Sequence, residues 1–257
     1  MSTTRIAKRE LRKHLKKILA TIPNESVTEQ TNTILSTLLT IPEYTSSKTI
    51  SIYLSMPTAE VQTSFLVKDA LKNGKRVFIP YCYKRSMKTT PSNQPAQPSQ
   101  SNEAGKIGEL EKISQPGQIM DMLELKDVQD YERLELDSWG IPTPSSDTLG
   151  KRRNCFGGYG KSEDLNIEEA DTEDELDLII TPGLGFDRSL GRIGRGMGFY
   201  DRFFERCAKF SRSGKVPWKV GLALDEQVLP ADQTVPMDET DQRIDALILG
   251  DGSVLRR

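Results

Sequence analysis

Apolar residues near the start of the chain recur every three or four positions. The first stripe consists of Leu11, Leu15, Ile18, Leu19 and Ile22, and Pro23 follows it. This spacing predicts an amphipathic helix that ends at the proline. A second stripe runs from Val27 to Leu39 and starts within the capping-box pattern Ser26-Val27-Thr28-Glu29, which predicts a second helix.

Short apolar runs farther along predict the strands of a sheet. Residues 49–54 and 76–80 have the composition of buried strands, and residues 60–73, closed by Gly74, form the helical pattern between them. Strand, helix and strand at this spacing predict a parallel βαβ unit with a right-handed crossover. Further strands are predicted at 176–181, 220–224 and 244–249. We therefore predict an α/β fold: a three-layer, mostly parallel, Rossmann-like sheet flanked by helices.

Two polar stretches interrupt this pattern. Residues 84–117 are rich in Pro, Ser, Gln, Asn and Lys, and residues 145–174 are polar and end in an acidic run. The glycine cluster at 157–160 lies in the second stretch and is followed by acids, so we interpret it as linker. We expect a single domain over 1–257 with disordered insertions at 84–117 and 145–174.

Composition excludes several classes of function. A net charge of -2 gives no general case for nucleic-acid binding, and no apolar run approaches the roughly 20 residues of a membrane span. The three cysteines are widely spaced, which indicates neither a disulfide framework nor a zinc site. The only histidine, His14, lies among basic residues of the first predicted helix. Ser-His-Asp, Cys-His and multi-histidine metal chemistry are therefore disfavoured.

The segment from Arg192 to Asp201, RIGRGMGFYD, carries the strongest chemical signal in the chain. Its three glycines stand at every second position among two arginines, and a carboxylate closes it. Glycine lets backbone amides approach an anion, and arginine supplies forked donors that match phosphate oxygens. Tyr200, Phe203, Phe204 and Cys207 follow at helical spacing. The loop therefore abuts a predicted helix N-terminus, which favours phosphate.

This loop is neither of the two commonest nucleotide motifs. A P-loop has Lys and then Ser or Thr after its last glycine, whereas Phe199 and Tyr200 follow here. The dinucleotide fingerprint is G-x-G-x-x-G, whereas this loop is G-x-G-x-G. An isolated glycine-rich loop is more often a flexible turn, but the arginines and Asp201 favour an anion site.

Charged residues in three other segments are candidates for the same site. Lys8 and Arg12 lie four residues apart on the first predicted helix, where the alternative is a solvated basic face. Glu60 follows the strand at 49–54, and its alternative role is that of a favourable acid in a first helical turn. Asp241 lies in an acidic turn before the last predicted strand.

Taken together, these segments resemble the 5-formyltetrahydrofolate cyclo-ligase family, also called methenyltetrahydrofolate synthetases. The resemblance covers most of the chain outside the two insertions. It is carried by AKRELR at 7–12, ISIYLSM at 50–56 with Glu60 after it, WGIP at 139–142, PGLGFD at 182–187 and the loop at 192–201. Met197 and Phe199 depart from the family's usual loop, which has Tyr-Tyr after its glycines.

The resemblance implies a role for each matching residue. ATP would be held by Lys8, Arg9, Arg12, Arg192, Ile193, Gly194, Arg195, Gly196, Met197, Gly198, Phe199 and Tyr200. The folate would contact Leu54, Met56, Glu60, Trp139 and the loop residues Arg195, Gly196, Met197, Gly198 and Phe199. Asp201 and Asp241 match Mg²⁺ ligands. We assign catalytic roles to Arg195, Lys8 and Tyr200.

The implied reaction is the ATP- and Mg²⁺-dependent conversion of 5-formyltetrahydrofolate to 5,10-methenyltetrahydrofolate, with release of ADP and phosphate. The substrate supplies both nucleophiles, so the protein must mainly align reactants and neutralise charge. The alternative is a non-catalytic nucleotide- or phosphosugar-binding regulator on the same scaffold. Binding of nucleic acid by the basic helix is disfavoured because that helix lacks interleaved aromatics.

Residues 1–22 are basic and amphipathic, like a mitochondrial presequence. Cleavage there would remove Lys8 and Arg12, so we expect a cytoplasmic protein, with a mitochondrial location as the alternative. We expect a monomer whose partners are its small-molecule substrates, with neither nucleic acid nor membrane among them.

Overall fold

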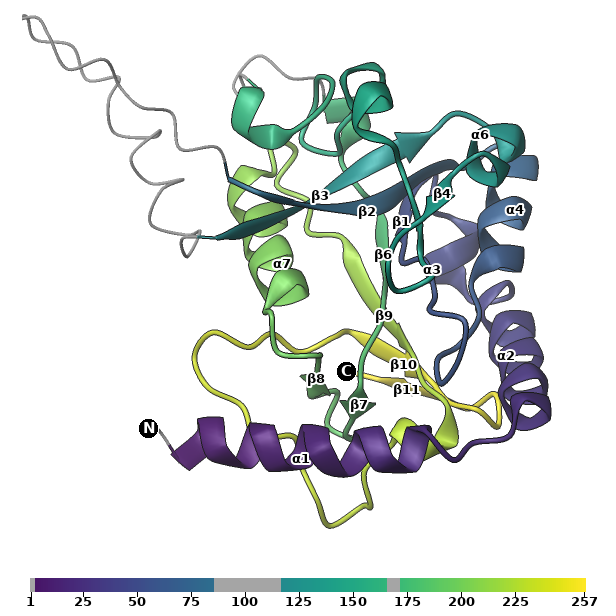
Figure 1. Ribbon diagram of the computed structural model, residues 1–257, viewed down its shortest axis with the longest axis vertical. Coiled ribbons are helices and arrows are strands. Elements are labelled where there is room, and N and C mark those ends of the chain that lie inside the picture. Colours follow the sequence, from purple (N-terminus) through teal and green to yellow (C-terminus); the bar gives the residue numbers. More distant parts are fainter. Residues whose placement is uncertain (1–2, 86–116, 166–171) are drawn as a thin grey trace, which may run out of the picture.

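A seven-stranded sheet, drawn in Figure 1, forms the centre of the protein. The computed structural model describes residues 3–85, 117–165 and 172–257. The strand order is β11-β10-β9-β6-β1-β2-β3, with both edge strands antiparallel to their neighbours and the others parallel. These strands are β1 (Thr49–Ile52), β2 (Arg76–Lys84), β3 (Gln118–Leu125), β6 (Leu178–Thr181), β9 (Trp218–Leu222), β10 (Ala246–Ile248) and β11 (Val254–Arg256). This architecture confirms the predicted α/β fold.

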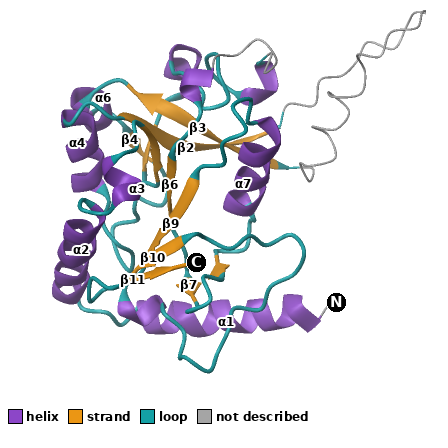
Figure 2. Ribbon diagram, turned by 180° about the vertical axis from the view of Figure 1, so that it is seen from behind, coloured by secondary structure: helices purple, strands orange, loops and turns teal. Residues whose placement is uncertain are grey.

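Helices cover both faces of the sheet, as Figures 1 and 2 show. The α-helices of the described residues are α1 (Thr3–Leu19), α2 (Asn24–Leu38), α3 (Pro42–Thr45), α4 (Ser64–Lys72), α6 (Val128–Glu132) and α7 (Phe199–Phe210). Helices α2, α3 and α4 lie on one face and α7 lies on the other. Short 3-10 turns lie at Ser146–Lys151, Ser162–Asp164, Thr172–Asp174 and Asp225–Gln227.

The alternation of side chains along the buried strands explains how one sheet supports two apolar layers. In β6, Leu178 and Ile180 join the cluster that packs under α2 and α4, whereas Ile179 joins the cluster under α7. Successive side chains of a strand point to opposite faces, so a strand buried on both faces is apolar throughout. All four residues of β6 are accordingly buried.

Helix α1 lies across one end of the sheet, beside the two short strands β7 (Gly185–Phe186) and β8 (Arg192–Ile193). Its apolar residues Leu15 and Leu19 pack against Leu184 and Ile193. Leu184 follows β6, so α1 covers the carboxyl ends of the parallel strands. Ligands of open α/β sheets bind at that edge, which places the first helix where a site is expected.

Local signals gave some boundaries wrongly. The predicted capping box is absent: α2 begins at Asn24 after Pro23, and no side chain caps it. The predicted helix at 60–73 begins only at Ser64, so Glu60 lies in the preceding loop. A second pair of short strands, β4 (Glu135–Leu136) and β5 (Pro142–Thr143), encloses the turn that carries Trp139.

The second polar stretch is folded where the structure describes it, so the expectation of disorder at 145–165 was wrong. Arg152 donates to both carboxylate oxygens of Asp130 at 2.6 and 2.7 Å. Phe156 packs on Phe203 of α7, with ring centroids 5.6 Å apart. Buried ion pairs and an aromatic anchor can hold a segment whose overall composition is polar. Most of the first insertion, 86–116, lies outside the described residues.

Within the described ranges, no helix is both long and apolar enough to cross a bilayer.

Candidate active site

The glycine-rich loop is held between a β-hairpin and a helix. Strand β8 pairs with β7, and the loop leaves β8 to enter α7 at Phe199. Gly196 and Gly198 have φ values of 107° and 64°, in the left-handed region that residues with a Cβ avoid. Gly198 is the N-cap of α7, so the loop ends at the free amides of the helix. The predicted contact between loop and helix N-terminus is confirmed.

Arg192 is the buried anchor of this loop. Its side chain is 3% exposed, and Nη2 donates to Asp201 Oδ2 at 2.9 Å. The guanidinium lies over the rings of Tyr200 and Phe204, 5.6 and 5.8 Å from their centroids. Its Nε is buried without an acceptor among the described residues. A buried guanidinium with a free donor is suited to an anionic ligand.

Helix α1 brings two of the predicted cations to the loop. Arg12 Nε donates to the carbonyl of Gly194 at 2.9 Å. Lys8 is almost fully buried, and its ammonium bonds to Asp238 at 2.6 Å and also to Asp241. Burial opposes the charged form of Lys8, but the two carboxylates outweigh it and raise its pKa. Lys8 is therefore a fixed positive charge, and a solvated basic face does not describe this side of α1.

The two carboxylates predicted to bind Mg²⁺ lie close together. Asp201 Oδ1 accepts from the backbone N–H of Gln242, the residue after Asp241, at 3.1 Å. Arg12 lies within electrostatic reach of both carboxylates, which oppose the lowering of its pKa by burial. The described residues contain no group of three metal-binding side chains. Two carboxylates fit Mg²⁺, which takes one or two such ligands together with substrate phosphates.

Asp238 is a member of this cluster that the sequence did not single out. Its Oδ2 accepts from Lys8, while Thr240 donates to Oδ1 from both its backbone N–H, at 3.0 Å, and its hydroxyl, at 2.6 Å. The hydrogen bonds from Lys8 and Thr240 lower the pKa of Asp238 to about 2. The available signal was its position three residues before Asp241 in the same acidic turn.

Glu60 is a buried carboxyl in the loop after β1. Its Oε2 accepts from the backbone N–H of Met56 at 2.9 Å, and only 7% of the residue is exposed. Burial raises the pKa of Glu60, whereas the Met56 amide and Arg195 oppose the rise. Because Glu60 lies outside α4, the alternative of a first-turn helix acid was wrong. Its carboxyl lies within electrostatic reach of the loop.

Trp139 lies on a tight turn at the same side of the protein as the Glu60 loop. Asp137 Oδ1 accepts from the backbone N–H groups of Trp139 and Ile141, which fixes the turn. A Cβ on Gly140 would lie 2.9 Å from Pro57, so this turn packs directly on the loop that follows β1. The Trp139 side chain is 65% exposed and free to contact a ligand.

The remaining predicted site residues differ in accessibility. Arg195 and Met197 are exposed at the tip of the loop, whereas Leu54 is buried in the core. Arg9 is exposed and pairs only with Glu10 among the described residues. The Tyr200 hydroxyl is buried without a described partner, and burial raises its pKa far above the ordinary value. Tyr200 is therefore a neutral group at physiological pH.

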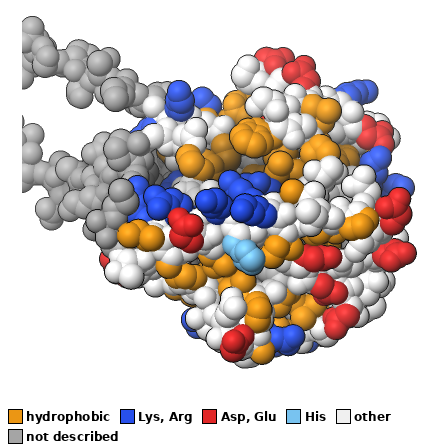
Figure 3. Space-filling view, turned by 60° about the horizontal axis from the view of Figure 1, so that its bottom comes forward, with side chains coloured by type: hydrophobic (Ala, Val, Ile, Leu, Met, Phe, Trp, Pro, Cys, Tyr) orange, Lys and Arg blue, Asp and Glu red, His pale blue; other side chains and the backbone are white. Residues whose placement is uncertain are grey.

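The surface of this end of the molecule is basic. Figure 3 shows Lys and Arg side chains gathered next to His14, the chain's only histidine. Lys13, Lys16 and Lys17 of helix α1 are exposed. A basic surface raises the local concentration of anionic ligands.

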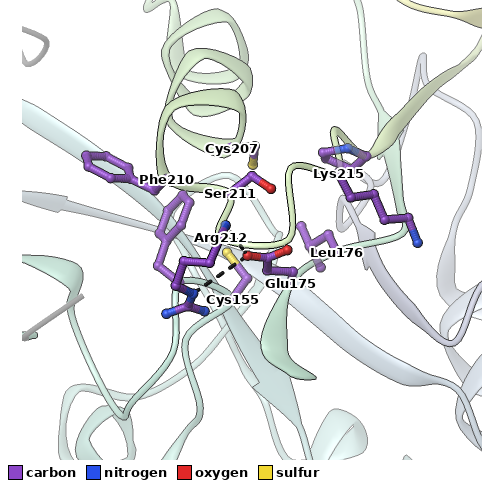
Figure 4. A pocket seen from close by; sticks show the side chains of 10 residues that line it. Cys155, Glu175, Leu176, Cys207, Phe210, Ser211, Arg212 and Lys215 are labelled. Atoms are coloured by element: carbon purple, nitrogen blue, oxygen red, sulfur yellow. Dashed lines mark hydrogen bonds and ion pairs between the residues drawn. The ribbon is translucent and has the colours of Figure 1, made fainter. Parts of the chain in front are cut away.

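A separate pocket lies at the opposite end of α7 (Figure 4). Cys155, Cys207 and Phe210 line it, and Arg212 meets Glu175 at its rim. None of the predicted site residues lines this pocket.

The fold and the collected charges define an α/β protein with a glycine- and arginine-rich loop at the carboxyl ends of its strands. The sequence profile of the 5-formyltetrahydrofolate cyclo-ligase family matches residues 4–250. The chain therefore belongs to this family, and it is an enzyme.

Relatives support this assignment over nearly the whole chain. The 5-formyltetrahydrofolate cyclo-ligase of Mus musculus is 31% identical over 254 residues, covering 97% of this chain and 96% of the relative. The probable 5-formyltetrahydrofolate cyclo-ligase of Schizosaccharomyces pombe is 29% identical and covers 95% of both chains. The NMR structure of Aquifex aeolicus 5,10-methenyltetrahydrofolate synthetase superposes with a TM-score of 0.55 at 22% identity, covering 97% of this chain and 92% of that one. At this identity the structural similarity supports the fold alone.

Proposed function

We propose that this enzyme uses ATP and Mg²⁺ to convert 5-formyltetrahydrofolate to 5,10-methenyltetrahydrofolate, releasing ADP and phosphate. The observation that carries this proposal is the convergence of Lys8, Arg12 and Arg192 with Asp201 and Asp241 around one glycine-rich loop. Four chain segments supply these groups. Such a set of cations and carboxylates suits a metal-bound triphosphate.

The residues act on the reactants through position and charge. In the proposed reaction the formyl oxygen attacks the γ-phosphorus, the bond to the bridging oxygen breaks and ADP leaves. Nitrogen 10 then attacks the formyl carbon, loses its proton, and phosphate departs as the ring closes. Arg195, exposed at the loop tip, would stabilise the transferring phosphoryl group, and Lys8 and Arg192 would orient the phosphates. Mg²⁺ held by Asp201 and Asp241 would neutralise further negative charge.

The folate would lie between the Glu60 loop and the Trp139 turn. The exposed indole of Trp139 can flank the pterin, and Glu60 can accept hydrogen bonds from its ring nitrogens. Tyr200, being neutral and buried, would act by contact and orientation. Helix α1 is packed into the fold and carries Lys8, so we further propose that α1 is not removed as a presequence. We also propose that the enzyme is cytoplasmic and monomeric.

The test is a turnover assay with purified protein, ATP, Mg²⁺ and 5-formyltetrahydrofolate. We expect the absorbance of the methenyl product to rise and one phosphate to be released per product. Omission of ATP should abolish both signals. Binding of ATP without any product from competent substrate would contradict the proposal and favour a non-catalytic regulator.

A further inference from the structure

The first turn of α7 carries a further arginine, Arg202, beside the glycine-rich loop. It is half-buried, and its guanidinium carbon lies 5.6 Å from the centroid of the Phe199 ring. No carboxylate or carbonyl among residues 3–85, 117–165 and 172–257 accepts a hydrogen bond from it. Arg206, one turn farther on, is by contrast fully engaged with Asp121 and Ser162. Arg202 is therefore held in place by an aromatic ring while its donors remain available.

Arg202 follows Asp201 on the helix, but the two side chains have different neighbours. Successive side chains of a helix point about 100° apart, and Asp201 points toward Arg192 and Gln242. Arg202 instead lies against the N-cap, because a Cβ on Gly198 would be 2.8 Å from its Nη1. Arg202 therefore contacts Gly198 and Phe199, two loop residues that are predicted to contact the folate.

A shared neighbour in β2 also relates Arg202 to the Trp139 turn. The thiol of Cys82 in β2 lies within electrostatic reach of both Arg202 and Asp137. Asp137 is the residue that fixes the Trp139 turn. Arg202 and this turn are therefore both within electrostatic reach of Cys82, and a folate that contacts Phe199 and Trp139 would lie near a guanidinium whose donors are available.

We propose that Arg202 binds a carboxylate of the glutamate tail of the reduced folate, an inference that rests on the function proposed above. The tail is the only anionic part of that substrate, and a guanidinium fork matches a carboxylate with two parallel hydrogen bonds. Stacking on Phe199 orients the fork and lowers the entropy lost on binding. Arg202 thus determines specificity for the tail and takes no part in the chemistry.

The experiment compares two substrates that differ only in the tail: 5-formyltetrahydrofolate and 5-formyltetrahydropteroate, which lacks glutamate. We expect Arg202→Ala to raise KM for the first about tenfold, equivalent to about 1.4 kcal/mol, and to leave KM for the second unchanged. The values of kcat and of KM for ATP should stay within about twofold of wild type. A raised KM for one substrate with unchanged kcat is the result expected when only a binding contact with that substrate is lost. Arg202→Lys, which keeps the charge without the fork, should lie in between.

Lys209→Ala is the matched control, since Lys209 is an exposed cation two turns along the same helix. It should behave as wild type with both substrates. Equal effects of Arg202→Ala on both substrates, no effect on either, or a raised KM for ATP would overturn the tail subsite while leaving the reaction intact. An inactive wild-type enzyme would overturn the proposed function and the subsite with it.

Discussion

Replacing Arg192 separates the part it plays in the fold from the part proposed for it in ATP binding. The Arg192–Asp201 pair is nearly enclosed, with side chains 3% and 15% exposed. Removing one partner of a buried pair typically costs about 3–5 kcal/mol because the other charge is left uncompensated. Asp201 keeps its hydrogen bond from Gln242, so we expect about 3 kcal/mol for Arg192→Met, plus about 1 kcal/mol for the lost ring contacts.

The double variant Arg192→Met/Asp201→Asn removes both charges. Its stability should recover by about 2 kcal/mol relative to the single variant, because no unpaired carboxylate remains. Urea unfolding measures these free energies. Arg188→Met, at an exposed position on the same hairpin connection, is the control and should stay within about 0.5 kcal/mol of wild type.

Affinity for ATP should not recover with stability. Calorimetry should show ATP binding weakened about a hundredfold in the single variant, which lacks the phosphate donor, and at least as much in the double variant, which also lacks a carboxylate proposed to bind Mg²⁺. Recovery of ATP affinity in the double variant would contradict both proposed roles, that of Arg192 as a phosphate donor and that of Asp201 as a Mg²⁺ ligand. A double variant as unstable as the single would refute the reasoning about the buried pair.

Three other changes test separate parts of the account. Arg195→Ala should lower kcat about a hundredfold with little loss of stability, as measured by turnover and melting. Burial raises the pKa of Glu60, so its protonated carboxyl contributes stability below its ordinary pKa, and this contribution is lost as pH rises through the higher folded pKa. Parallel melts should therefore show Glu60→Gln becoming more stable relative to wild type as pH rises through that range. Arg206→Met leaves the buried Asp121 carboxylate without its ion-pair partner, and should lower the free energy of unfolding in urea by about 3–5 kcal/mol. For each of these three variants, behaviour close to that of wild type would contradict the expectation.

The sequence predicted the inner strands and the place of the glycine-rich loop at a helix N-terminus because their signals are local. The run at 178–180 is apolar, and the glycines at 196 and 198 occupy backbone conformations that glycine favours. Strand β3 was missed because Gln118–Leu125 mixes polar and apolar residues and follows the low-complexity stretch. Its assignment depends on pairing with β2, which no local pattern encodes.

The folding of residues 145–165 was missed for a related reason. The composition of this stretch shows that it is polar, but it does not show which residues its side chains pair with, and these lie elsewhere in the chain. Arg152 pairs with Asp130, and Ser162 accepts a hydrogen bond from Arg206. The same applies to Asp238, whose importance is visible only once α1 brings Lys8 to it. The structure of these segments therefore depends on charge pairs between residues far apart in the sequence, which hydrophobic periodicity does not reveal.

The central claim is that the loop at 192–201 and helix α1 together bind the triphosphate of ATP. The most direct measurement is a calorimetric titration of the intact protein with ATP and Mg²⁺, repeated with Lys8→Met. The account predicts saturable one-site binding to wild type and binding weakened at least tenfold in Lys8→Met, since Lys8 is a nearly buried cation of the site. Absence of binding heat with wild type over a range of temperatures, or equal affinity in the variant, would contradict it.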